Sequence, residues 1–224
     1  MVEILFWAAT ALAVAFGLGL LARYRQQRAP FYVCWTVSFG LYAVAYSAEA
    51  LSLQSHWTLL LYQFYIVASA SLVGAMSAGT TYLAFSRTVG HLYTVGMAVC
   101  AAVLMGSILT APPHLHGTWI VLNSGQGVIL GLAQVMYAIM ASVGGTVVLV
   151  GAVWSWWKTK RTYNLLIALG ALASGVGGML VSQGVALSVL PAWNIAGLIL
   201  IFLGYLYSRS THGGRSATLA TPHG

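Results

Sequence analysis

Long apolar segments follow one another along almost the whole chain, and short polar connections separate them. A segment needs about 20 mainly apolar residues to cross the roughly 30 Å hydrocarbon core of a bilayer as a helix. The pattern therefore predicts an all-α, polytopic membrane protein with a seven-transmembrane-helix bundle. The segments that meet this requirement are 4–22, 31–53, 57–84, 91–111, 127–156, 163–186 and 190–208.

The basic residues fall in four short clusters that follow the first, third, fifth and seventh predicted helices. Loops rich in Lys and Arg stay in the cytoplasm. With seven spans all four clusters lie on one side, whereas a count different by one would distribute them over both faces. The prediction is an N-terminus outside and a C-terminus in the cytoplasm. The clusters are Arg23, Arg25 and Arg28; Arg87; Lys158, Lys160 and Arg161; Arg209 and Arg215.

The charge content supports a membrane location. Of 224 residues, 60% are hydrophobic and 5% are charged, whereas about a quarter of the residues in a soluble domain are charged. The net charge of +7 does not predict nucleic-acid binding, because the basic residues lie between apolar runs and form no basic face. Membrane lipids are the expected partners, in the cell membrane (inner or plasma membrane), where the chain is multi-pass.

The chain divides into a membrane domain, 1–209, and a cytoplasmic tail, 210–224. The tail is rich in Gly, Ser and Thr and too polar to bury a core, so we expect it to be disordered. Within the membrane domain, small residues recur at helical spacing, which lets helices pack closely in lipid. These ridges are Ala70, Gly74 and Ala78 in the third span, and Gly170, Ser174, Gly178 and Ser182 in the sixth.

Glu49 is the one carboxylate inside a predicted span. It lies about four residues, on the order of 6 Å, below the outer end of the second helix. A carboxylate near hydrocarbon is costly, so Glu49 should face the bundle interior, a partner or water. It ends a stripe in which residues step by three or four and so share one helix face: Trp35, Ser38, Tyr42, Tyr46 and Glu49.

Other polar residues, Tyr137 among them, lie at a similar depth near the outer ends of their helices. The functional interpretation is an outward-facing polar cavity around Glu49, since pockets between helices of bundles are common ligand sites. The structural alternative is a set of interhelical hydrogen bonds and headgroup-level side chains. The candidate ligand-binding residues are Glu49, Tyr42, Tyr46, Gln63, Tyr65, Gln134, Gln183 and Asn194.

Several kinds of site are not expected. A retinal Schiff base needs a lysine in the bundle core, but Lys158 and Lys160 are the only lysines and both lie in a predicted cytoplasmic loop. Haem usually requires histidines within the spans, whereas the histidines here lie at span ends, in the outer loop or in the tail. No nucleophile, metalloprotease, phosphate-loop or dinucleotide motif occurs. We therefore expect no enzyme activity and no catalytic residues, cofactor or metal, and two free thiols at Cys34 and Cys100.

The second and third spans, RYRQQRAPFYVCWTVSFGLYAVAYSAEAL and WTLLLYQFYIVASASLVGAMSAGTTYLAF, resemble small bacterial seven-helix integral membrane proteins of unassigned function. The junction AVWSWWKTKRTYNLLIALGALASGVGGMLVSQG is similar to the same group. More loosely, the chain resembles the seven-helix N-terminal sensor module of bacterial histidine kinases, in which a tryptophan of the second helix and a Gln-Tyr-type third helix recur, here Trp35, Gln63 and Tyr65. The segment after the seventh helix is too short for a kinase, so this resemblance implies signalling through a partner.

Three functions remain open on these grounds. The first is a sensory or regulatory module that signals through a membrane or cytoplasmic protein partner. The second is a small-solute or ion transporter or channel, for which the similar junctions RYRQQRAPFYV and WKTKRTYNLL would mark a repeat. The third is an accessory subunit of a membrane complex. A homo-oligomer is compatible with each of the three.

Overall fold

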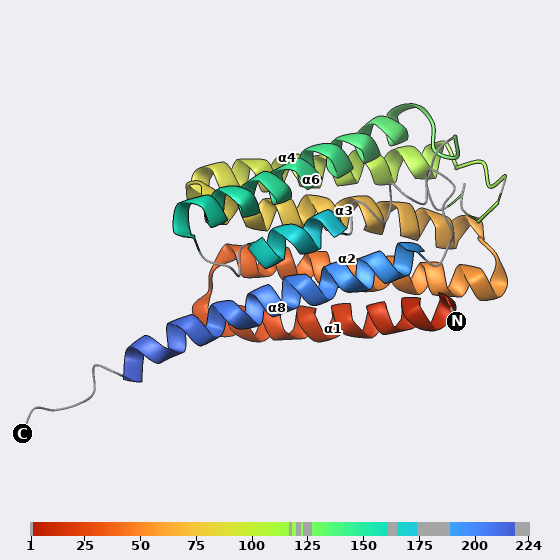
Figure 1. Cartoon of the computed structure of the whole chain (residues 1–224). Helices are drawn as coiled ribbons and strands as arrows, with labels where there is room; N and C mark the ends of the chain where they lie inside the picture. The colour runs from red at the N-terminus through yellow and green to blue at the C-terminus, as the bar shows by residue number, and fades with distance from the viewer. Residues whose placement is uncertain are drawn as a thin grey trace, which may run out of the picture.

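The computed structural model is a bundle of long helices that lie side by side (Figure 1). It describes residues 2–116, 118–119, 122, 127–160, 165–173 and 189–217. No strand occurs among these residues, which confirms the all-α prediction for them. The helices are α1 (Val2–Gln27), α2 (Pro30–Ser55), α3 (Leu59–Ala84), α4 (Arg87–Thr110), α6 (Gly131–Thr159) and α8 (Val189–Ala217), and residues 165–173 are also helical.

Helices α2, α3 and α4 begin at local start signals. Pro30 stands in the first turn of α2, where its missing N–H is not needed for a helical hydrogen bond. Thr58 and Ser86 are the N-caps of α3 and α4, and each hydroxyl accepts a hydrogen bond from the backbone three residues later. The cap at Ser86 starts α4 at Arg87, which is earlier than the expected start at 91.

Two later boundaries also differ from the expected ones. The span expected at 127–156 is α6, which begins at Gly131; the turn before it contains Gly127, whose φ of 71° glycine adopts without strain. Helix α8 continues to Ala217, past the expected end of the last span at 208; extending an existing helix is easier than starting one. Of the span expected at 163–186, only 165–173 lies within the described residues.

Helix α3 occupies the centre of the bundle. It packs against α2, α4 and α6, while α2 packs against α1 and α1 against α8. At Gly74 an added Cβ would lie 3.0 Å from Met140 of α6 and 3.6 Å from Met97 of α4. The small side chains of Ala70, Gly74 and Ala78 are buried, and they allow the neighbouring helices to approach closely.

The outer surface of the bundle is apolar. Helices α1, α2, α3, α4 and α6 are long and apolar enough to cross a membrane. On α4, Leu92, Val95 and Leu109 are more than half exposed, an arrangement that water disfavours and lipid solvates. The chain is therefore a multi-pass membrane protein. Helix α8 contributes a shorter apolar stretch, Ala192–Gly204, and the count of seven spans stays a prediction.

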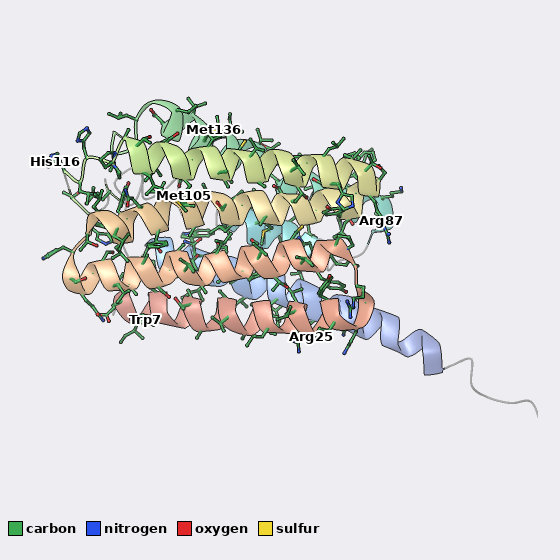
Figure 2. All side chains as sticks on the ribbon, turned by 180° about the vertical axis from the view of Figure 1, so that it is seen from behind. Trp7, Arg25, Arg87, Met105, His116 and Met136 are labelled. Carbon is green, nitrogen blue, oxygen red and sulfur yellow. The ribbon has the colours of Figure 1, made fainter. Side chains whose placement is uncertain are left out.

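The charged residues separate between the two ends of the bundle. In Figure 2, Arg25 and Arg87 lie at one end, and Trp7 and His116 lie at the other. Helix α1 begins at the end opposite to the one at which α8 ends (Figure 1). We call the end with Arg25 and Arg87 the basic end.

The opposite end holds both carboxylates of the chain, and we call it the acidic end. Glu3 lies in the first turn of α1, and Glu49 lies in the last two turns of α2. The Gln54 side chain donates a hydrogen bond to Glu3 and so ties the end of α2 to the start of α1. Among the described residues, no Lys or Arg lies at this end.

Candidate functional site

Glu49 lies on the buried face of α2, near the end of that helix at Ser55. Its side chain is 4% exposed. On the same face, Ser38, Tyr42 and Tyr46 are also buried, which confirms that the polar stripe faces away from lipid. The Ser38 hydroxyl donates to the backbone oxygen of Leu72 on α3 at 2.7 Å, so the stripe also holds the two helices together.

Two tyrosines of α2 and a phenylalanine of α1 enclose Glu49 on one side. The ring centroids of Tyr42 and Tyr46 are 4.8 Å apart. The Tyr46 ring lies 6.1 Å from that of Phe6, which has no exposed surface. Tyr46 also interacts electrostatically with Tyr42 and Glu49. These rings fill the space between α1 and the carboxyl group.

Helices α3 and α6 each bring another tyrosine to Glu49. The Tyr65 hydroxyl of α3 is hydrogen-bonded to the Glu49 side chain. Tyr137 of α6 is hydrogen-bonded to Ser69 of α3 and interacts electrostatically with Glu49. The carboxyl group of α2 therefore faces α3 and is within electrostatic reach of α6. We call Glu49 with its tyrosines the Glu49 cluster: Tyr42, Tyr46, Glu49, Tyr65 and Tyr137.

Two tryptophans, which we call the aromatic cover, lie over the Glu49 cluster at the acidic end. The Trp57 ring lies 5.0 Å from the Tyr65 ring and 5.3 Å from the Tyr62 ring. The Trp119 ring lies 6.2 Å from Trp57 and 6.0 Å from Phe6. Together the two indoles extend from α3 to α1 across the end of the bundle.

Hydrogen bonds fix the connection between α4 and α6 onto this cover. The Trp119 Nε1–H donates to Ser52 Oγ at 2.9 Å, and the Ser52 hydroxyl donates to the backbone oxygen of Glu49 at 2.7 Å. The Tyr62 hydroxyl donates to the backbone oxygen of Leu122 at 2.8 Å. Each such bond stabilises the fold by about 1 kcal/mol, and together they attach the connection to α2 and α3.

The structure brings together only part of the set predicted from the sequence. Glu49, Tyr42, Tyr46 and Tyr65 lie together as described. Gln63 instead faces α4, where its amide donates to the backbone oxygen of Ile108 at 3.2 Å. Gln134 is exposed on the outer surface of α6. Asn194 is buried on α8, the helix that packs against α1. Gln183 lies outside the described residues.

The aromatic cover was not predicted, because tryptophans near span ends are typical of membrane–water interfaces. One local signal could have identified Trp57. Thr58 is the N-cap of α3, so Trp57 and Tyr62 occupy the two positions that pack together as a hydrophobic staple at a helix start. The edge-to-face contact of their rings is this staple. No such local signal exists for Trp119, whose contacts with Phe6, Ser52 and Trp57 join segments distant in sequence.

The cluster offers one acidic group, phenol hydroxyls and aromatic rings. Among the described residues, no group of three or more His, Cys, Asp and Glu side chains could hold a metal ion. The two described cavities, of about 370 and 270 Å³, are both lined by residues other than Glu49. The chemistry available to the cluster is proton binding, or cation binding through charge and ring faces.

Searches of protein-family models, of curated proteins and of solved structures found no match to this chain.

Proposed function

We propose that this chain is a sensory or regulatory module of the cell membrane that binds a small cationic ligand at the Glu49 cluster and signals through a partner protein. The observation that carries the proposal is the buried Glu49 side chain, which is 4% exposed and hydrogen-bonded to Tyr65. Placing an acidic group inside a membrane bundle costs free energy, and such a group commonly marks a functional site. This one also interacts with tyrosines of α3 and α6.

The proposed topology has seven spans with the acidic end outside. The described basic residues gather at the opposite end, including Arg25 and Arg87 (Figure 2), and basic loops are retained in the cytoplasm. The Glu49 cluster then faces the exterior, and the ends of α6 and α8 reach the cytoplasm. A ligand outside the cell and a partner inside it would thus meet opposite ends of the same helices.

The expected ligand is a small organic cation. Aromatic faces attract cations through their quadrupoles, and quaternary ammonium groups are recognised in this way. The cluster and its cover supply tyrosine and tryptophan rings around one carboxyl group. An anionic ligand would meet no Lys or Arg at the acidic end among the described residues.

The enclosure of Glu49 couples binding to helix packing. Tyr46 and Tyr65 are 4% and 6% exposed, so a ligand reaches the carboxyl group only when rings of α2 and α3 move apart. A ligand shifts a conformational equilibrium by its preference for one of two states. Binding at Glu49 would therefore favour a different packing of α2, α3 and α6.

Two features favour sensing over transport. Transporters commonly build their substrate site from discontinuous helices at the bilayer midplane, whereas α2, α3 and α6 run unbroken past the Glu49 cluster. Glu49 also lies near the outer end of α2 and not at its middle. A site near the surface that rearranges continuous helices suits the detection of a ligand more than its passage.

The test uses the full chain in lipid nanodiscs, with choline as the probe and 3,3-dimethylbutan-1-ol as its neutral isostere. Intrinsic tryptophan fluorescence is measured, because Trp57 and Trp119 cover the site. Choline should change the fluorescence saturably, and the neutral isostere should not. Glu49→Gln should weaken this response at least tenfold, a loss of about 1.4 kcal/mol. The control Glu3→Gln removes the other carboxylate and should respond like the wild type.

Two outcomes would contradict the proposal. An unchanged choline response in Glu49→Gln would remove Glu49 from the ligand site. Choline uptake into liposomes that disappears in Glu49→Gln would instead assign the same site to a transporter. Glu49→Gln should fold like the wild type, as judged by its elution volume and thermal unfolding, so that loss of response reports on binding.

A further inference from the structure

One of the two described cavities lies at the basic end, far from Glu49 along the helices. Its volume is about 370 Å³, which falls within the ~300–1,000 Å³ of small-molecule sites. Its walls come from α2, α3, α6, residues 165–173 and α8. Small side chains at Ala84, Ala152 and Ala171 leave this space between the helices.

The walls of this cavity are mainly apolar. Trp35 and Phe39 of α2, Met76 of α3 and Val148 of α6 line its inner part. Among the lining residues that the structure describes, Lys158 is the one charged side chain, and none is a carboxylate or an amide. A polar, water-soluble ligand would lose more hydration here than the few polar groups of the lining, such as the Thr80 and Ser155 hydroxyls, could replace. The walls suit a hydrocarbon chain.

The depth of the cavity matches one leaflet of a bilayer. Along α6 the lining extends from Val148 to Lys158, which is about 15 Å of helix at 1.5 Å per residue. The hydrocarbon core of a bilayer is roughly 30 Å thick, so one leaflet contributes about half of that. The cavity therefore runs from the helix ends to about the level at which acyl chains end.

Lys158 marks the end of the cavity that an anionic group would occupy. It is exposed and lies in the last turn of α6. The neighbouring Lys160 is engaged differently, since its ammonium group lies 5.2 Å from the centre of the Trp156 ring. Arg87 starts α4 shortly after Ala84, which lines the cavity. Basic pockets between membrane helices bind anionic lipid headgroups.

We infer that this cavity binds one acyl chain of an anionic phospholipid from the leaflet at the basic end, with the lipid phosphate at Lys158. The apolar walls account for the chain, their depth accounts for its origin in that leaflet, and Lys158 accounts for the preference for negative charge. This site is separate from the Glu49 cluster and does not depend on its function.

Native mass spectrometry of the detergent-purified full chain tests the headgroup part. The probes are dioleoylphosphatidylglycerol and dioleoylphosphatidylcholine, which share their acyl chains. The wild type should bind phosphatidylglycerol more tightly. Lys158→Gln should weaken phosphatidylglycerol binding about fivefold and phosphatidylcholine binding by less, because the choline cation offsets the charge of the phosphate that both lipids share. Lys160→Gln makes the same charge change outside the cavity and should stay within about twofold of the wild type. Equal losses in both variants would overturn the inference.

A second pair of variants tests the acyl chain part. Ala171→Phe should fill the cavity and weaken binding of both lipids at least fivefold. Leu172→Phe places the same ring on a residue that is 42% exposed and outside the cavity lining, and should bind both lipids like the wild type. If Ala171→Phe does not fold, Ala171→Leu replaces it with the same expectation. Unchanged lipid binding in a folded Ala171 variant would overturn the inference. Oleate serves as a further probe, and oleate binding that phosphatidylglycerol does not displace would overturn the inference as well.

Discussion

The two ends of the bundle use the same helices in opposite ways. At the acidic end, α2, α3 and α6 bring Glu49, Tyr65 and Tyr137 together, and rings from α1 and from the α4–α6 connection fill the remaining space. At the basic end the same three helices carry small residues, and a cavity of about 370 Å³ remains between them. Close packing thus encloses an acidic group at one end, and open packing admits a ligand at the other.

At each end, the position of the charged group follows from how closely the helices pack. The enclosed acidic group lies among hydroxyls and rings that offset its desolvation, whereas the open apolar cavity has its cation at the exposed end. Substitutions that loosen the acidic end should therefore lower stability most. Substitutions at the basic end should change lipid binding more than stability, except where the helices are in direct contact.

The largest effect is expected for Phe6→Ala at the acidic end. Phe6 has no exposed surface and contacts the rings of Tyr46 and Trp119. Losing a buried phenylalanine costs about 3–5 kcal/mol, which thermal unfolding in detergent would detect. Ile4→Ala is the control, since Ile4 is 69% exposed on the same helix and should cost less than about 1 kcal/mol. Similar losses in both variants would mean that Phe6 has no special packing role.

At the basic end, Gly79→Ala should have the next largest effect. A Cβ at Gly79 would overlap the Trp35 ring, which lies directly over this glycine. Overpacking of this kind costs about 1–3 kcal/mol. Gly40→Ala is the matched control, because nothing lies within 4 Å of the added Cβ. Thermal unfolding of both variants checks the prediction, and equal stability of the two would show that the Trp35 ring moves freely.

Glu49→Ala and Glu49→Gln should differ in stability. Alanine leaves the Tyr65 hydroxyl without the hydrogen-bond partner that it has in Glu49, at a cost of about 1–3 kcal/mol. Glutamine retains an acceptor at nearly the same place and should cost less than about 1 kcal/mol. Equal and large losses of folded protein in both variants, measured by expression and unfolding, would make Glu49 a structural residue.

The smallest effect is expected for Tyr62→Phe, which removes the hydrogen bond to the backbone oxygen of Leu122. The cost should be about 0.5–1.5 kcal/mol, together with faster amide exchange in the connection between α4 and α6. Tyr32→Phe removes a hydroxyl at the basic end that bonds to the exposed Gln27 side chain, and should cost less. The opposite order would mean that the connection is not held by Tyr62.

The apolar runs and the low charge content predicted a helical, multi-pass membrane protein, because lipid imposes a long apolar run on each span. The apolar runs did not locate the helix starts, because caps such as Ser86 act before the apolar residues begin. The cost of an intramembrane acid predicted that Glu49 faces the bundle interior, a partner or water, and its burial in the bundle is the first of these arrangements. Gln63 faces α4 because of how the helices pack against one another, and the sequence of a single helix does not specify that packing.

The remaining parts of both sites depend on contacts between distant segments. Trp119 reaches the acidic end through a connection without a regular pattern, and its partner Ser52 lies on α2. The cavity at the basic end exists because small residues of several helices coincide, among them Ala84, Ala152 and Ala171. None of these residues is unusual in its own segment, so only their arrangement in space identifies the site.

Cysteine labelling in intact cells tests the proposed orientation of the two ends most directly. In a background with Cys34→Ala and Cys100→Ala, single cysteines replace His116 at the acidic end, and Gln26 and Arg215 after the first and seventh spans. A membrane-impermeant maleimide should label His116→Cys in intact cells, and the other two only after permeabilisation. Labelling of His116→Cys and Arg215→Cys in the same compartment would contradict both the topology and an outward-facing Glu49 cluster.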